Sequence, residues 1–374
     1  MTIGRRAYPL HQSSYRLRKN NFDLLRLLFA GTVCLVHVYK LSGYPELMTV
    51  TRYLSSEVAV KGFFVISGFL IFMSFERSAS MRSYAVKRVR RIYPAYGTVI
   101  LLCAVGLIAA SSRNMGDYFS LAWVKYLFAN LTFLNFLEHS LPGVFATNRV
   151  TAVNGALWTL KIEVMFYMAV PLFVFLFRRF GYFPSLVLLY CASVGYALGC
   201  AWMARQTGFA MYDELGRQLP GQLSYFMAGG FLYYYLPVFE KRAGYFVAGA
   251  AMVLIVDKAY ALPFLEPFAL ATIVVFLGLF FYVGNFGKYG DFSYGVYIIH
   301  FPVIQLILYF GWFHGSPWLF MAAVTAITAV GAIAMWHLVE KRFLLRSSHY
   351  VATTASTADN GVNPSIGASV PGIS

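Results

Sequence analysis

Two ionisable residues, Arg26 and His37, lie in the first long apolar stretch of the chain, "RLLFAGTVCLVH". An ionisable side chain costs roughly 2.5 to 3.5 kcal/mol at the centre of a membrane helix, so such residues usually mark functional sites. Their spacing of eleven residues is about 1100°, close to three full turns, and ~16 Å along the axis, which predicts one shared helix face. Asp23, three residues before Arg26, is placed to pair with it. The alternatives are an arginine that snorkels to the membrane surface and a histidine bonded to a neighbouring backbone group.

A carboxylate, Glu163, is predicted to lie at the same depth as His37. Glu163 follows "WTLKI" and lies ~8 Å below the outer boundary, and His37 lies ~6 Å below it, by the helical rise. A carboxylate orients an imidazole and raises its basicity, which suits a general base near neutral pH. We expect His37 to be a base oriented by Glu163. The alternative is a structural ion pair of Glu163 with Lys161 or Lys61.

The basic run "KRVRRIYPAY" at 87–96 places Arg88 and Arg91 three residues apart, on one side of a helix at the membrane surface. The planar guanidinium binds phosphate oxygens in a bidentate manner better than an ammonium does. The pair therefore predicts a phosphate-binding site at this surface. The alternative is that the run only follows the positive-inside rule.

Two further segments, "FFVISGFL" at 63–70 and "SYGVYIIHFP" at 293–302, place polar side chains inside apolar stretches. Small residues such as Ser67 and Gly68 usually permit close helix packing, and Ser67 is also a candidate for donor binding. His300 is expected ~13 Å from the inner boundary, near the bilayer middle. His337 and Glu340 are expected to be boundary residues at the inner end of the last span. The candidates for lining a cavity are Asp23, Lys61, Trp158, Ser293, Tyr294, Tyr297 and His300.

The elements that would position these residues are apolar stretches long enough to cross ~30 Å of hydrocarbon as helices. The sequence predicts an all-α polytopic membrane protein with about ten transmembrane helices. The predicted spans are 22–41, 57–76, 92–111, 158–177, 182–203, 219–238, 243–257, 262–283, 291–311 and 316–338. The segment 118–138 contains Lys125, Asn130 and Asn135, and is expected to be an interfacial or re-entrant helix on the outer side.

Composition supports a membrane protein, because 59% of the residues are hydrophobic and 12% are charged, against roughly 25% charged in soluble domains. The net charge of +15 does not indicate nucleic-acid binding, since the basic residues cluster between apolar stretches. The four cysteines, Cys34, Cys103, Cys191 and Cys200, lie in apolar segments without paired spacing. Disulfides, structural metal and redox chemistry are therefore not expected.

The distribution of Lys and Arg predicts that both termini are cytoplasmic. With ten spans, 19 of these residues fall in cytoplasmic segments and 8 outside, as the positive-inside rule favours. We expect a basic cytoplasmic segment at 1–20, without a cleaved signal peptide. A membrane domain at 21–342 and a disordered cytoplasmic tail at 343–374 are predicted to follow.

Five motifs in order resemble acyltransferase family 3, a family of integral membrane O-acyltransferases that acetylate O-antigen, exopolysaccharide, peptidoglycan and other acceptors. They are Arg26 with ten residues before His37, "FFVISGFLI" at 63–71, Arg88 and Arg91 before "IYPAY", "WTLKIE" ending at Glu163, and "SYGVYIIHFP" at 293–302. The resemblance covers about residues 20–342. It implies location in the bacterial cytoplasmic (inner) membrane.

The resemblance also implies the substrates and the site. The donor would be acetyl-CoA, bound from the cytoplasmic side near Arg88 and Arg91, with Arg26 and His37 matching the family's essential arginine and histidine. Glu163 matches its acidic position after the tryptophan. The acceptor would be a glycan hydroxyl at the outer face, reached either by direct transfer or through an acylated His37.

Two other functions are compatible with the buried charges. A proton-coupled exporter of glycan or lipid would use His37, Glu163 and His300 as a relay, and a structural membrane subunit would use them only to fix helix packing. The sequence shows no internal repeat of the kind found in many transporters. The repeat-free pattern and the ordered motifs favour the acyltransferase.

Overall fold

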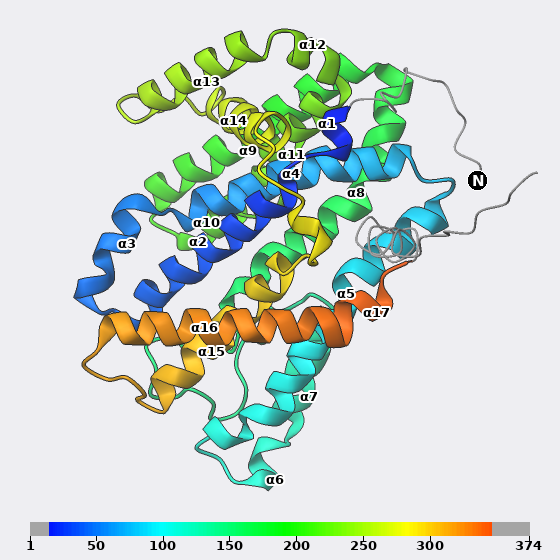
Figure 1. Cartoon of the computed structure of the whole chain (residues 1–374). Coiled ribbons are helices and arrows are strands. Elements are labelled where there is room, and N and C mark those ends of the chain that lie inside the picture. The colour runs from blue at the N-terminus through cyan, green and yellow to red at the C-terminus, as the bar shows by residue number, and fades with distance from the viewer. Residues whose placement is uncertain (1–14, 346–374) are drawn as a thin grey trace, which may run out of the picture.

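The computed structural model describes residues 15–345, and within this range the chain is all-helical (Figure 1). The helices are α1 (Tyr15–Arg18), α2 (Phe22–Ser42), α3 (Met48–Tyr53), α4 (Ser56–Glu76), α5 (Met81–Gly106), α6 (Met115–Tyr118), α7 (Leu121–Leu131), α8 (Trp158–Phe180), α9 (Tyr182–Thr207), α10 (Ala210–Gly216), α11 (Leu219–Tyr234), α12 (Leu236–Lys241), α13 (Ala243–Asp257), α14 (Glu266–Phe280), α15 (Ser293–Tyr309), α16 (Pro317–Met335) and α17 (Lys341–Phe343).

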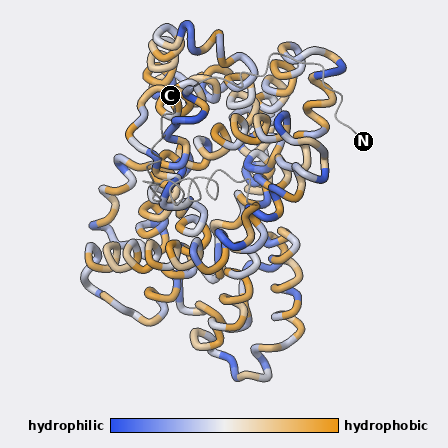
Figure 2. Tube along the Cα trace, turned by 45° about the vertical axis from the view of Figure 1, so that its right-hand side comes forward, coloured by the Kyte–Doolittle hydropathy of each residue, from blue (hydrophilic) through white to orange (hydrophobic). Residues whose placement is uncertain are grey.

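All ten apolar stretches predicted to span the membrane are helical over most of their length. Within the described residues, six helical segments are long and apolar enough to cross a membrane, and they contain α2, α4, α5, α8, α9 and α16. The helices α13, α14 and α15 are apolar but shorter. Figure 2 shows that hydrophobic residues make up most of the helical trace. The chain is thus a multi-pass membrane protein, while ten spans and cytoplasmic termini remain predictions.

The boundaries differ from the predicted spans at two places that matter for function. The helix α5 begins at Met81, before its apolar part, so the basic run 87–91 lies within a helix and its spacing is helical. The segment 118–138 contains only the short helix α7, which projects with α6 at one end of the bundle (Figure 1). The predicted N-terminal segment and C-terminal tail lie largely outside the described residues.

The helix α4 is at the centre of the bundle and contacts α2, α8, α11 and α14. Its contact with α11 is very close at Gly68, where a Cβ atom would lie 2.0 Å from the carbonyl oxygen of Phe226. A glycine is therefore required at this position, as the small-residue pattern predicted. Phe72 and Phe166 pack around the Phe226 ring and fill the space beside this contact.

The helix α15 packs against α2 on one side and α16 on the other. Figure 1 shows α16 crossing in front of α15, although the two are joined by a short loop. The segment between α7 and α8 is held to α15 by polar contacts, since Asn148 donates to the side-chain oxygen of Gln305 at 2.9 Å and Asn154 donates to the carbonyl of Ile298 at 2.8 Å. The triad of α2, α4 and α15, with α5 and α8 beside it, positions the polar residues described next.

Candidate active site

A pocket of about 360 Å³ lies where α2, α4, α5 and α8 meet. Its lining includes one carboxylate, Glu163, and six basic side chains. The basic residues are Arg26, Arg77, Lys87, Arg88, Arg90 and Arg91. Such a pocket favours a ligand that carries several negative charges. We call it the basic pocket.

Arg88 is held at the wall of the basic pocket and keeps an unused donor. Its guanidinium donates to the hydroxyl of Ser74 at 3.1 Å and lies 5.7 Å from the ring centre of Tyr167. Its Nε is buried and has no hydrogen-bond partner among the described residues. A buried donor without a partner is costly unless a ligand supplies the acceptor. Arg88 is therefore suited to bind an anionic group in the pocket.

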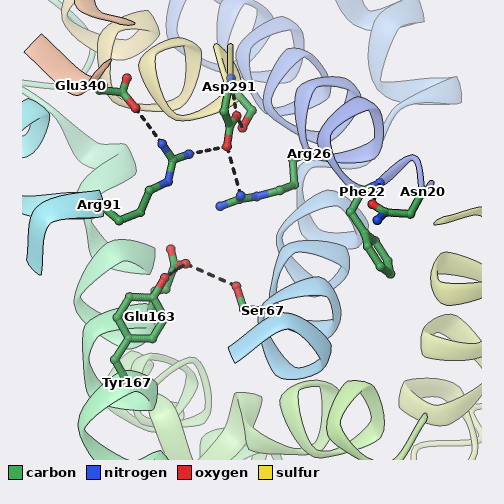
Figure 3. Close-up of polar contacts among 10 residues, drawn as sticks. Asn20, Phe22, Arg26, Ser67, Arg91, Glu163, Tyr167, Asp291 and Glu340 are labelled. Atoms are coloured by element: carbon green, nitrogen blue, oxygen red, sulfur yellow. Dashed lines mark hydrogen bonds and ion pairs between the residues drawn. The ribbon is translucent and has the colours of Figure 1, made fainter. Parts of the chain in front are cut away.

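Arg91 is fixed by carboxylates instead, in an arrangement that we call the arginine–carboxylate cluster: Arg26, Arg91, Asp291 and Glu340 (Figure 3). Asp291 accepts from Arg26 at 3.1 Å and also from Arg91, and Glu340 accepts from Arg91 at 3.0 Å. The two carboxylate side chains are 1% and 2% exposed. Two guanidiniums face two carboxylates here, so the buried charge is balanced.

The local backbone places Asp291 toward the arginines. Gly290 has φ +122°, and a Cβ atom there would lie 2.3 Å from the indole nitrogen of Trp336, so only glycine fits this turn. Asp291 then accepts from the backbone N–H of Ser293 at 3.1 Å and from its hydroxyl, at the start of α15. A π-helical turn, Trp336–Glu340, brings Glu340 to the same point, and such turns are frequent at functional sites.

Two residues of the cluster differ from the sequence-based expectation. Glu340 was expected at the membrane boundary, but it is buried and bonded to Arg91, because the π-helical turn rotates it toward α5. Asp291 was not identified from the sequence at all. The available signal was an acidic residue at the start of an apolar span, where a charge needs a partner.

A second, smaller cavity of about 30 Å³ adjoins the basic pocket, and the two share Arg26, Ser67 and Glu163 in their linings. The smaller cavity has both apolar and hydroxyl-bearing walls. Its other lining residues are Val60, Phe63, Phe64, Thr159, Leu160, Ser293, Tyr294 and Tyr297. Of the candidates for lining a cavity, Ser293, Tyr294 and Tyr297 thus lie here.

Glu163 lies at the junction of the two cavities and not beside His37. It accepts from the hydroxyl of Ser67 at 3.3 Å and from the hydroxyl of Tyr167 (Figure 3). Within residues 15–345 the structure gives no hydrogen bond between Glu163 and His37. Equal depth does not bring the two residues into contact, because α2 packs mainly against α15 and α4, and α4 lies in contact with both α2 and α8.

His37 pairs instead with His300 on α15. Nδ1 of His37 lies 2.8 Å from Nε2 of His300, and the rings are nearly parallel, at 13°, with centroids 5.1 Å apart. His300 is fully buried and His37 is partly buried. The ring of Tyr297, which lines the smaller cavity, lies 5.9 Å from the His300 ring. The pair is therefore one residue layer away from the smaller cavity.

The predicted polar face of α2 is directed toward one neighbour along its length. Arg26 contacts Asp291, just before α15, and His37 contacts His300, within α15. Both contacts run in the same order along the chain, so the two helices pack in parallel at this interface. The spacing of Arg26 and His37 thus corresponds to two contacts with the same partner helix.

The remaining predicted site residues take structural positions. Lys61 pairs with Glu57 at 2.8 Å and Glu266 at 3.5 Å, and this pairing replaces the alternative ion pair with Glu163. Trp158 begins α8 and packs against the hydrophobic core. Asp23 is partly buried one turn before Arg26 on α2.

Comparison with known proteins bears on what this arrangement does. Residues 19–337 match the acyltransferase domain that defines acyltransferase family 3. The chain is 29% identical to "O-acetyl transferase" of Shigella phage Sf6, over 88% of this chain and 98% of the relative. It is 26% identical to "Nodulation protein 10" of Rhizobium leguminosarum bv. viciae, over 93% of this chain and 98% of the relative.

No solved structure matches the chain significantly. The family match covers every helix from α2 to α16 and includes the histidine pair, the basic residues of the basic pocket, and Arg26, Arg91 and Asp291 of the arginine–carboxylate cluster. The family match indicates an enzyme rather than a transporter or a purely structural subunit. The chain belongs to acyltransferase family 3 and is a membrane-embedded acyltransferase.

Proposed function

We propose that this acyltransferase transfers an acetyl group from cytoplasmic acetyl-CoA to a hydroxyl group of a cell-surface or exported glycan, such as O-antigen, at the bacterial inner membrane. His37 is the general base in this proposal. The relative named O-acetyl transferase supports the acetyl group and the oxygen acceptor. The positive-inside rule supports a cytoplasmic position for the basic end of α5.

The observation that carries the proposal is that the basic pocket and the smaller cavity share Arg26, Ser67 and Glu163 in their linings, with the histidine pair one residue layer beyond the smaller cavity. A nucleotide thioester has phosphates at one end and a reactive carbonyl at the other. The basic pocket suits the phosphates, with Arg88 offering an Nε that has no partner within residues 15–345. The smaller cavity, about 30 Å³, is far smaller than the basic pocket, about 360 Å³, which favours a small acyl group over a long chain.

The chemistry requires a base because a hydroxyl is a weak nucleophile until its proton is removed. His37 takes the proton, the acceptor oxygen bonds to the carbonyl carbon, and the carbon–sulfur bond breaks. The proton then passes to the released thiolate. Arg26, which lines both cavities, is placed to neutralise negative charge between the phosphate end and the reacting end. Glu163 positions Ser67 and Tyr167 at the junction between them.

The test compares two arginines of α5 in membranes from a glycan-producing bacterium, with labelled acetyl-CoA as donor and label in the glycan as readout. Arg88→Ala removes a charge-assisted contact of about 1.5 to 3 kcal/mol, so KM for acetyl-CoA should rise roughly 10- to 100-fold with little change in kcat. Arg82→Ala is the matched control, since Arg82 is exposed and outside the pocket lining. Labelling that is independent of acetyl-CoA, or equal KM values in both variants, would refute the proposal.

A further inference from the structure

The hydrogen bonds of His300 determine which of its nitrogens carries a proton. Its Nδ1 lies 3.1 Å from the carbonyl oxygen of Val296, one turn earlier on α15. A carbonyl oxygen only accepts, so Nδ1 of His300 must be the donor. In the neutral ring the other nitrogen, Nε2, then has a lone pair and accepts.

The neutral form of His300 is the one that its surroundings favour. The side chain is fully buried, and a buried charge is costly without a counter-charge. Its contacts among the described residues are with His37, the backbone of Val296, and the rings of Tyr297 and Phe301. None of these groups is a carboxylate. The carboxylates of the arginine–carboxylate cluster are bonded to guanidiniums instead.

The neutral His300 in turn sets the state of His37. Nδ1 of His37 lies 2.8 Å from the accepting Nε2 of His300, and two lone pairs facing each other at that distance would repel. The proton of a neutral His37 therefore lies on Nδ1. Its Nε2 has a lone pair, and within residues 15–345 it has no hydrogen-bond partner.

We infer that His300 is a positioning residue that fixes the tautomer of His37, so that Nε2 of His37 is the atom that accepts the proton of the acceptor hydroxyl. This inference rests on the proposed function. A carboxylate performs this task in the Ser-His-Asp triads of hydrolases, whereas here the orienting group is an uncharged imidazole held by a backbone carbonyl. When His37 gains a proton, its Nδ1–H is already bonded to His300, so no side chain has to move.

Nuclear magnetic resonance of the full chain in lipid nanodiscs, with ¹⁵N-labelled histidine, reads the tautomer directly. Spectra at about pH 8, where an unperturbed histidine is neutral, should show a protonated Nδ1 and an unprotonated Nε2 for His37. The signals are assigned by their loss in His37→Gln. A proton on Nε2 of His37 would overturn the inference.

Two variants of His300 test its consequence for catalysis. His300→Phe keeps a ring but removes the acceptor, so His37 should become a mixture of tautomers and kcat should fall at least about 10²-fold, the scale of general-base catalysis. KM for acetyl-CoA should change less than about 3-fold. His300→Gln keeps an accepting oxygen and should recover part of the loss, which a purely structural role of the ring would not predict.

His337→Phe is the matched control, because His337 is exposed and its ring contacts Phe292 rather than the histidine pair. If His300→Phe does not fold, the wild-type spectrum and His300→Gln still decide the question. An unchanged His37 tautomer in folded His300→Phe would refute the inference. If the spectra are as expected but no acetyl-CoA-dependent transfer occurs, the proposed function is wrong while the hydrogen-bond arrangement stands.

Discussion

The arginine–carboxylate cluster and the histidine pair each include a contact between α2 and the α15 region, yet they differ in charge. The cluster holds two guanidiniums against two buried carboxylates, so ion pairs fix the positions of its arginines. The histidine pair has no carboxylate among its described contacts, so it stays neutral and keeps a lone pair available. The difference separates a region suited to hold permanent charge from one suited to move a proton.

The substitution with the largest expected effect breaks the histidine pair without disturbing the arginine–carboxylate cluster. His37→Gln removes the base, so acetyl transfer should fall about 10³-fold, within the range of general acid–base catalysis. The melting temperature in detergent should change little, because glutamine still offers a donor to His300. The measurement is labelled acetyl incorporation together with thermal unfolding, and His139→Gln, at an exposed position, is the control. Undiminished incorporation would contradict the role of His37.

The substitution with the next largest expected effect breaks the arginine–carboxylate cluster. Asp291→Asn removes one of the two negative charges that face Arg26 and Arg91. Removing one partner of a buried ion pair costs about 3 to 5 kcal/mol, because the other charge is left buried without compensation. We expect the free energy of unfolding to fall by about 3 kcal/mol, measured as a lower melting temperature in detergent. Asp213→Asn, at an exposed position on α10, should melt like the wild type. Equal stability of the two variants would show that Asp291 does not compensate the arginines.

A smaller effect is expected from a substitution in the smaller cavity, between the arginine–carboxylate cluster and the histidine pair. Phe63 lines the smaller cavity and packs against Tyr297 at 5.6 Å between ring centres. Phe63→Ala enlarges this space, and one methylene in an apolar pocket changes discrimination by about 1 to 3 kcal/mol. The ratio of propionyl to acetyl transfer, measured with the two CoA thioesters, should rise about 10-fold. A constant ratio would place the acyl group elsewhere.

The smallest effect distinguishes the two carboxylates of the cluster. Glu340→Gln keeps an oxygen that accepts from Arg91, and Oε1 of Glu340 has no partner among the described residues. We therefore expect a loss of about 1 kcal/mol, the scale of one hydrogen bond, and a smaller fall in melting temperature than for Asp291→Asn. A larger fall than for Asp291→Asn would reverse the ranking of the two carboxylates.

The sequence predicted the helical class, the apolar stretches and the shared face of Arg26 and His37, because periodicity and hydropathy are local properties. It also identified Arg88 and His300 as candidates from their chemical type. It did not predict that His37 pairs with His300, because depth along a helix does not determine which neighbouring helix it faces. Asp291 and Glu340 were missed for a similar reason, since a glycine turn and a π-helical turn orient them, and neither has a strong local pattern.

The parallel packing of α2 on α15 makes the length of the segment between Arg26 and His37 a constraint in its own right. Each inserted or deleted residue would rotate one end of α2 by about 100° relative to the other. Asp291 or His300 would then lose its counterpart, although no polar residue had been replaced. The number of intervening residues, ten, is therefore constrained independently of their identity, and a shift in their count would disable the enzyme as thoroughly as loss of the imidazole.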